Sequence, residues 1–165
     1  MNILKVFGWI ALFLFAGSLQ AKKIEIIDIR CENQECPMGV QTLKPTFSWK
    51  LLGDTRNLTQ VGYRILVSDN EDLLKKDIGN IWDSGRCNSE ISINILFGGK
   101  KLLSAARYYW KVQVWDNQGV QSKWSEIKSF QMGLMKQEDW APARWIAMEL
   151  SLIHISEPTR HLRIS

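Results

Sequence analysis

Residues 107–116 place the strongest constraint on what this chain can fold into. Their side chains alternate with a period of two, which is the period of a β-strand and not of an α-helix. One face carries Tyr108, Trp110, Val112 and Val114, and the other carries Tyr109, Lys111, Gln113 and Trp115. We therefore predict a long strand here, with its first face packed into a hydrophobic core.

Six further short strands are predicted along the chain, each bounded by turn-forming residues. They cover residues 24–29, 46–51, 60–67, 81–85, 91–95 and 124–132. Residues 32–41 are predicted to form a loop, and residues 71–78 a helical turn with Asp69 or Asn70 as its N-cap. Seven strands, each with one apolar face to bury, favour an all-β antiparallel sandwich of two sheets.

One connection within this pattern resembles a tyrosine corner. Leu102 and Leu103 are followed by Arg107 and Tyr108, at the start of the longest strand. In such corners a phenol tethers the loop that crosses from one sheet to the other. We therefore expect Tyr108 to hold this crossover.

Residues 1–21 have the pattern of an export signal. Lys5 precedes an apolar run at residues 6–15, and small residues follow it. An apolar run of about ten residues is too short to cross the hydrocarbon layer of a membrane as a helix. We expect a cleaved signal peptide, a periplasmic or secreted location and no stable membrane anchor, with an uncleaved anchor as the alternative.

Charge and histidine content exclude several classes of function. The net charge of +4 falls to about +2 without residues 1–21 and 150–165, and the positive charges are scattered. This balance does not favour nucleic-acid binding. Both histidines, His154 and His161, lie in the last segment, so the rest of the chain has no Ser-His-Asp triad and no histidine metal ligand. We expect no cofactor, no metal and no nucleic-acid partner.

The three cysteines, Cys31, Cys36 and Cys87, leave two interpretations open. In an oxidising compartment one pair could form a disulfide and leave one free thiol. Alternatively, all three are small buried thiols. There is no CxxC motif, so neither a redox pair nor a zinc site of that kind is predicted.

The aromatic residues outside the predicted core are the candidate contact sites. Tyr109 and Trp115 share the second face of the longest strand, where they would stack on a sugar or dock against a following domain. Trp124 lies in a Ser-Lys-Trp-Ser sequence and is expected to interleave with basic side chains in a cation–π ladder. These three residues are the possible sugar or interdomain contacts, and no catalytic residue is predicted.

The carboxylates are predicted to be structural or solvated. Asp83 and Asp116 lie at strand ends, where they would cap turns or pair with Arg86 or Arg107. The acidic groups at residues 69–72 and 138–139 lie in polar segments that show no sign of burial. Burial is the usual way of raising a carboxyl pKa, so no raised pKa is predicted for these groups. We expect them on the solvated surface.

A succession of motifs resembles a known family. In order along the chain these motifs are Pro37-Met38-Gly39, Pro45-Thr46-Phe47-Ser48-Trp49, Trp82-Asp83-Ser84-Gly85-Arg86, Arg107-Tyr108-Tyr109-Trp110, Ser122-Lys123-Trp124-Ser125 and Phe130-Gln131-Met132-Gly133-Leu134. The succession resembles the N-terminal fibronectin-type-III/immunoglobulin-like domain of bacterial α-L-rhamnosidases, glycoside hydrolase family 78. The resemblance implies a seven-stranded fibronectin-type-III/immunoglobulin-like sandwich.

The resemblance also implies an activity that resides elsewhere in the parent enzyme. Enzymes of this family are inverting hydrolases that remove terminal α-L-rhamnose, with two catalytic carboxyl groups in an α/α barrel. The sandwich leaves no room for such a barrel, so we expect this chain to be a non-catalytic accessory or scaffold domain. Its expected partners are the following domains of the parent enzyme and rhamnose-containing glycans.

The predicted organisation has four parts: a signal peptide at residues 1–21, the sandwich at 22–134, a linker with the start of a second β-sandwich at 135–149, and a non-native tail at 150–165. The tail resembles a sequencing adapter translated in frame, with a genuine basic C-terminus as the alternative. Two other functions remain open. One is a free-standing carbohydrate-binding or adhesion module, and the other is a fragment of a different multidomain glycosidase.

Overall fold

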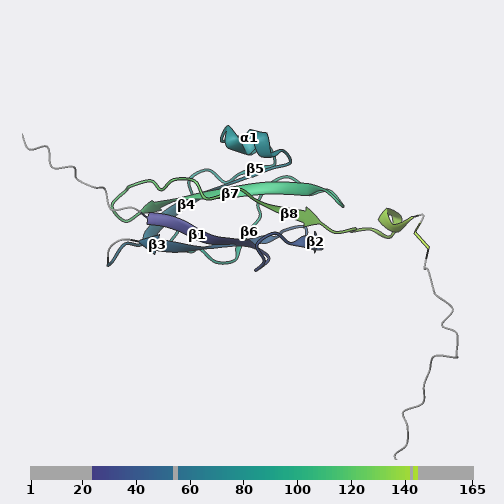
Figure 1. Cartoon of the computed structure of the whole chain (residues 1–165), viewed down its shortest axis with the longest axis horizontal. Helices are drawn as coiled ribbons and strands as arrows, with labels where there is room; N and C mark the ends of the chain where they lie inside the picture. The colour runs from purple at the N-terminus through teal and green to yellow at the C-terminus, as the bar shows by residue number, and fades with distance from the viewer. Residues whose placement is uncertain (1–23, 54–55, 142, 145–165) are drawn as a thin grey trace, which may run out of the picture.

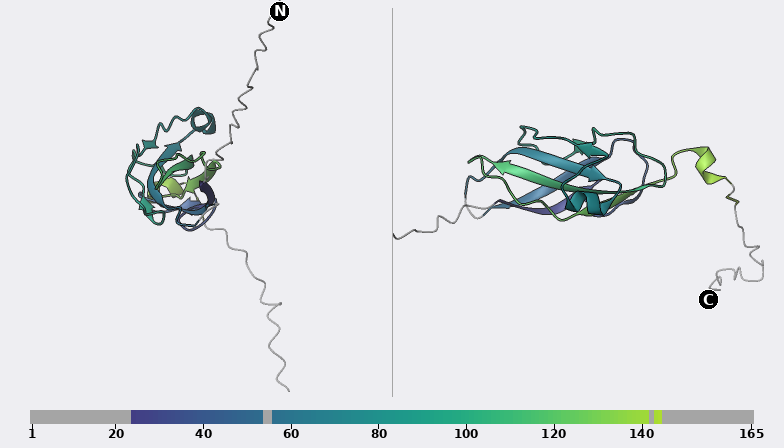
Figure 2. Two further views of the ribbon diagram at one scale, coloured as in Figure 1. Left: turned by 90° about the vertical axis from the view of Figure 1, so that its left-hand side faces the viewer. Right: turned by 90° about the horizontal axis from the view of Figure 1, so that it is seen from above.

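The computed structural model describes residues 24–53, 56–141 and 143–144, which form a sandwich of two β-sheets (Figure 1). The predicted signal peptide and the predicted non-native tail lie outside these residues. The smaller sheet has the order β1-β3-β6, and the larger has the order β2-β8-β7-β4-β5. Two orthogonal views show the sheets stacked face to face, with the two ends of the described chain at opposite ends of the sandwich (Figure 2).

The eight strands of the described residues have the following bounds. The smaller sheet contains β1 (Ile24–Cys31), β3 (Thr46–Gly53) and β6 (Ile95–Leu96). The larger contains β2 (Met38–Val40), β4 (Gln60–Ser68), β5 (Trp82–Asp83), β7 (Arg107–Asp116) and β8 (Lys128–Met132). All pairs are antiparallel except β2 with β8. The predicted two-sheet sandwich is confirmed, with one strand more than predicted and one parallel pair.

The core lies between the sheets and is built from the period-two faces. On β7, the four residues of the first face are all buried, as predicted. Phe47 on β3 meets Trp110 on β7 with 4.5 Å between ring centroids, and Trp49 meets Tyr63 edge-on at 5.3 Å. Such aromatic pairs add to the area-proportional gain from burial. The aromatic contacts therefore fasten the smaller sheet to the larger one.

The predicted strand at residues 91–95 is wrong for most of its length. Only Ile95–Leu96 forms a strand, and Ile91 and Ile93 are exposed. The side-chain amide of Gln60 donates to the carbonyls of Ser89 and Ile91, at 3.1 and 3.0 Å. A side chain from the other sheet thus occupies acceptors that a strand would offer to its neighbour, so the segment follows β3 in an irregular path.

Other boundaries also differ from prediction, and the predicted strand at residues 81–85 is reduced to Trp82–Asp83. The predicted loop at residues 32–41 contains β2, where Gly39 adopts a positive φ of 79° within a short parallel pair with β8. The predicted last strand starts at Lys128 rather than at residue 124. A period of two cannot be recognised in a strand of three residues. It also does not distinguish a strand from an extended segment whose hydrogen bonds to its neighbour are made partly by side chains.

The predicted helical turn is confirmed in a shorter form. Helix α1 (Glu71–Lys75) begins after Asn70, whose side chain accepts a hydrogen bond from the Asp72 N–H at 2.8 Å. The helix covers the outer face of the larger sheet and buries Leu74 there (Figure 1). A second short element, the 3₁₀ helix η1 (Gln137–Trp140), follows the sandwich. Within the described part of the chain, no helix is long and apolar enough to cross a membrane.

Candidate functional site

The outer face of the larger sheet carries an aromatic ring that lies close to two cations. Trp124 lies with its ring centroid 4.6 Å from the Lys111 ammonium nitrogen and 5.9 Å from the guanidinium carbon of Arg64. Lys111 belongs to β7 and Arg64 to the adjacent strand β4. Both distances are within the range of cation–π attraction. The expected interleaving of Trp124 with basic side chains is therefore present.

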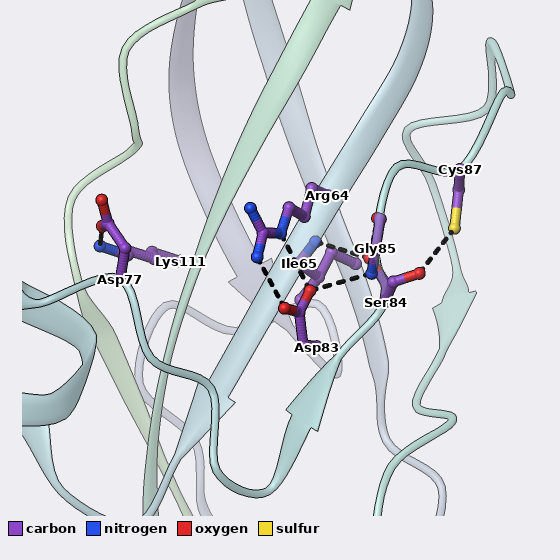
Figure 3. Close-up of polar contacts among 8 residues, drawn as sticks. All are labelled: Arg64, Ile65, Asp77, Asp83, Ser84, Gly85, Cys87 and Lys111. Carbon is purple, nitrogen blue, oxygen red and sulfur yellow. Dashed lines mark hydrogen bonds and ion pairs between the residues drawn. The ribbon is translucent and has the colours of Figure 1, made fainter.

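Each of these cations is also paired with a carboxylate (Figure 3). Arg64 binds Asp83 through two hydrogen bonds, Nη2 to Oδ2 at 2.6 Å and Nε to Oδ1 at 2.9 Å. Lys111 donates to Asp77 and to the Leu74 carbonyl, and its side chain is only 5% exposed. A buried ammonium group without such partners would be strongly destabilising. Lys111 is therefore held in the fold by α1 and the loop that follows it.

The contacts of Asp83 differ in part from the prediction. Asp83 caps a turn, as expected, by accepting a hydrogen bond from the Gly85 N–H at 2.9 Å, but it pairs with Arg64 and not with Arg86 or Arg107. The hydrogen bond from Arg64 is the main cause that lowers the pKa of Asp83 below its usual value. Asp83 therefore remains ionised at neutral pH.

Two serine hydroxyls place Trp124 on this face. The hydroxyls of Ser122 and Ser125 accept hydrogen bonds from the N–H groups of Val114 and Val112, both at 3.0 Å. In return, the serine N–H groups donate to the carbonyls of the same two valines. The segment thus runs alongside β7 without belonging to the sheet, and the two serine contacts flank Trp124 in the sequence.

Tyr109 and Trp115 do not form one platform with each other. On β4 their register partners are Ser68 and Gly62, at opposite ends of the pairing. Six residues of strand separate the two rings by roughly 20 Å. The guanidinium of Arg86 lies over the Trp115 ring at 4.9 Å, so this ring is already stacked within its own domain. Contact of these aromatic residues with sugar or with another domain remains a prediction.

A groove runs along one open side of the sandwich, between β1 and the segment that carries Trp124. It encloses about 680 Å³ and is lined by Ile24 to Arg30 and by Glu35, Lys123, Trp124, Ser125, Glu126 and Lys128. At its rim Asp28 contacts Arg30 at 2.7 Å and Lys50 at 2.6 Å. This groove was not predicted, because its two walls lie about 100 residues apart in the sequence and meet only in the folded sandwich.

The segment that leaves the sandwich is tied down, which corrects the prediction of a solvated carboxylate at residue 139. The Asp139 carboxylate accepts hydrogen bonds from the Ser104 hydroxyl at 2.6 Å, the Lys136 N–H at 2.8 Å and the Met135 N–H at 3.1 Å. The Ser104 hydrogen bond is the main cause that lowers the pKa of Asp139. The predicted polar linker therefore begins as an ordered part of the domain.

The carboxyl groups whose pKa is shifted indicate whether this domain has an acid that could donate a proton near neutral pH. Among the described residues, hydrogen bonds lower the pKa of the carboxyl groups of Asp28, Asp83 and Asp139. A carboxylic acid that donates a proton near neutral pH needs a raised pKa instead. Such carboxylates are suited to holding cations and backbone N–H groups. Among the described residues, no cluster of His, Cys, Asp and Glu could hold a metal ion.

All three cysteines are free thiols in the structure, in different surroundings. Cys31 is fully buried in the core, and burial raises the pKa of its thiol to about 12. Cys36 is exposed, and Cys87 is half-buried beside the Ser84 carbonyl.

The Tyr108 phenol accepts a hydrogen bond from the Leu103 N–H, so the predicted tether of the crossover is present. Together with the two sheets and the aromatic contacts between them, it defines an immunoglobulin-like sandwich domain. Residues 26–136 match the family described as the Rha78A-like N-terminal immunoglobulin domain. The chain therefore belongs to this family, the N-terminal Ig-like domain of α-L-rhamnosidases of glycoside hydrolase family 78.

Individual relatives agree with this assignment. The chain is 38% identical over 112 residues to an α-L-rhamnosidase of Formosa agariphila, and 32% identical over 111 residues to one of Streptomyces avermitilis. These matches cover 68% and 67% of this chain but only 12% and 10% of the relatives. The chain thus spans about one eighth or less of their length.

Solved structures give the same result. The α-L-rhamnosidase of Dictyoglumus thermophilum superposes with a TM-score of 0.68 and 35% identity, over 70% of this chain and 13% of that enzyme. The Streptomyces avermitilis α-L-rhamnosidase, in complex with L-rhamnose, also gives 0.68, with 28% identity over 72% of this chain and 11% of that enzyme.

Proposed function

We propose that this chain is the non-catalytic N-terminal domain of a larger, exported α-L-rhamnosidase, and that it serves as a scaffold for the domains that follow. The observation that carries the proposal is the match over residues 26–136, together with the small share of each relative that it covers. Export is inferred from the signal-like sequence at residues 1–21. Hydrolysis of terminal α-L-rhamnose belongs to the parent enzyme.

The carboxyl groups of the described residues favour a structural, non-catalytic role for this domain. Inverting glycosidases need a general acid and a general base on two carboxyl groups roughly 6.5–9.5 Å apart, and the acid needs a raised pKa. Asp83 is engaged by Arg64, and Asp139 by Ser104 and two backbone N–H groups. Both carboxyl groups have lowered pKa values, which suits a structural role.

The test is to recover the uninterrupted reading frame from the genome and to express both forms. The long form should release L-rhamnose from p-nitrophenyl α-L-rhamnoside, and the 165-residue chain should release none above the buffer rate. A catalytically active 165-residue chain contradicts the proposal. A natural stop codon soon after residue 149 also contradicts it and favours the free-standing module.

A fluorescence titration of this chain with L-rhamnose addresses the sugar-binding alternative. Trp115 and Trp124 are already stacked against Arg86, Lys111 and Arg64 of the same domain. We therefore expect no saturable change in tryptophan emission up to millimolar sugar. A saturable change that the Trp115→Ala variant abolishes would support the binding module instead.

A further inference from the structure

The chain leaves the sandwich at a point where three segments meet. The Gly133 N–H donates to the Val40 carbonyl of β2 at 2.8 Å, and its own carbonyl accepts from the Ala105 N–H at 3.1 Å. The Ser104 hydroxyl oxygen lies 3.2 Å from the Gly133 carbonyl oxygen. Strand β2, the crossover loop at residues 102–106 and the exit segment are therefore adjacent at this end of the sandwich.

The exit segment is locked to the crossover loop by one carboxylate. Asp139 lies 35 positions after Ser104, yet its Oδ2 atom accepts that hydroxyl hydrogen bond and two backbone hydrogen bonds. The Met135 N–H also approaches the Ser104 hydroxyl oxygen, at 3.0 Å. Hydrogen bonds to a charged acceptor are stronger than neutral ones. The direction in which the chain leaves the domain is therefore fixed, and η1 projects from this end of the sandwich (Figure 1).

Each of these segments carries a large apolar side chain that the described residues leave exposed. Met38 of β2 is 77% exposed, Leu103 of the crossover loop is 65% exposed, and Trp140 of η1 is 53% exposed. Each belongs to one of the segments joined at Gly133 or locked by Asp139. Single exposed apolar residues are common, but a group of them at one place marks a contact surface.

We infer that this end of the sandwich is a preformed seat for the domain that follows in the parent chain, and that Asp139 locks the connecting segment in the orientation that brings this domain onto the seat. The inference rests on the proposed function and adds the surface through which the scaffold acts. The seat consists of Met38, Leu103 and Trp140, and the lock consists of Ser104 and Asp139.

The following domain is the occupant because of where the chain continues. The start of the next sandwich is predicted within residues 135–149, so at most nine residues separate it from Trp140. Nine extended residues reach about 30 Å, so the next domain begins within this distance of Trp140. Its tethering also makes docking intramolecular, and a modest apolar surface is then sufficient. Relatives about eight times longer than the matched segment supply such a domain.

The lock is tested on the 165-residue chain by amide hydrogen exchange. The Lys136 N–H donates to Asp139, whereas the Met135 N–H also lies within hydrogen-bond distance of the Ser104 hydroxyl oxygen. The Lys136 amide should therefore exchange at least tenfold faster in the Asp139→Ala variant than in the unmodified chain. Glu138→Ala, at the neighbouring acidic residue, is the matched control and should leave the rate of the Lys136 amide unchanged. Equal exchange rates in the Asp139→Ala variant and the unmodified chain would overturn the inference.

The seat is tested by comparing the same variants in the long form and in the 165-residue chain. The Leu103→Ser/Trp140→Ser variant keeps the Leu103 N–H and should lower the melting temperature of the N-terminal domain by roughly 4 °C or more in the long form, and by less than 1 °C in the short chain. Leu52→Ser is the control. Leu52 is 54% exposed and pairs with Glu25 near the start of β1, at the other end of the sandwich from the seat. Equal shifts in both forms, or none in either, would overturn the seat.

The outcomes also separate the inference from the proposed function. A long form that hydrolyses rhamnosides but shows no form-dependent shift contradicts the seat and keeps the scaffold assignment. A long form that shows the shift but releases no rhamnose supports the seat and contradicts the rhamnosidase assignment.

Discussion

The phenol oxygen of Tyr108 accepts a hydrogen bond from the backbone N–H of Leu103 at 2.9 Å. The ring of Tyr108 is buried and packs on Phe130 with 5.5 Å between centroids. A residue in the core of the larger sheet thus holds the loop that arrives from the smaller sheet. This loop also carries Ser104, so the tyrosine corner supports the segment to which Asp139 is bound.

Replacing Tyr108 by Phe removes this acceptor and leaves the Leu103 N–H without its partner. We expect the free energy of unfolding to fall by about 1–3 kcal/mol, the usual cost of a buried donor left unpaired. Guanidinium unfolding followed by tryptophan fluorescence measures this change. Tyr109→Phe is the control, because the Tyr109 hydroxyl makes no hydrogen bond to the described residues, and it should change stability by less than 0.5 kcal/mol. Equal stability of both variants would contradict the tyrosine corner.

Gln60 is a second buried polar group on which the fold depends. Its amide oxygen accepts a hydrogen bond from the Trp49 indole N–H at 2.9 Å, and its amide nitrogen donates hydrogen bonds to the carbonyls of Ser89 and Ile91. Gln60→Leu keeps the approximate volume but leaves these groups without partners, so we expect a loss of about 2–4 kcal/mol. Thermal and guanidinium unfolding measure it. Gln118→Leu, in an exposed turn, is the control, and a comparable loss there would contradict this explanation.

The same residue explains why the sequence predicted the regular strands well and the segment at residues 89–96 poorly. The alternation in β3, β4 and β7 reports burial of one face, which local sequence encodes directly. Ile91 and Ile93 alternate in the same way, but the Gln60 amide occupies their segment's carbonyls from the opposite sheet. A long-range contact of a polar side chain leaves no periodic trace in the sequence.

The candidate contact residues show the same difference between local and long-range information. The setting of Trp124 was predictable because its neighbouring serine and lysine residues are local in sequence. Its actual cation partners, Lys111 and Arg64, depend on the register between β4 and β7. The lock at Asp139 was missed because Ser104 lies 35 residues away and the intervening strands must first be placed.

The Trp124–Lys111 contact should be measurable as a coupling energy. Cation–π pairs contribute about 0.5–2 kcal/mol, with larger values where the cation is desolvated, as Lys111 is. We expect a double-mutant cycle of Trp124→Leu and Lys111→Met to give a coupling energy within this range. The cycle is measured by guanidinium unfolding, with Trp140→Leu and Lys111→Met as the control pair. Strict additivity in the Trp124 cycle would show that the ring and the ammonium group do not interact energetically.

The pH dependence of stability should contain a contribution from Asp28. Hydrogen bonds from Arg30 and Lys50 lower the pKa of this carboxyl group from 3.8 to about 2. A lowered pKa in the folded state means that the contribution is present above about pH 3.8 and is lost as the pH falls toward 2. Asp28→Asn removes the charge but suits the backbone, whose φ of 48° is one that Asn tolerates well. The unfolding midpoint of this variant should therefore depend less on pH between 4 and 2 than that of the unmodified chain.

The decisive measurement is the titration of the Asp28 carboxyl carbon by NMR, together with guanidinium midpoints at several pH values in this range. Asp28 closes a bulge of β1 at the rim of the groove, where the register with β3 shifts between Ile27 and Arg30. If Arg30 and Lys50 hold Asp28 there, the NMR titration of its carboxyl group has its midpoint near pH 2. The Lys50→Met variant should then move this titration midpoint to higher pH. Glu25→Gln, on the same strand but without these contacts, should leave the titration of Asp28 unchanged. A midpoint close to 4 in the unmodified chain would mean that the two cations do not hold the bulge in solution, because an unpaired carboxylate titrates near its ordinary value.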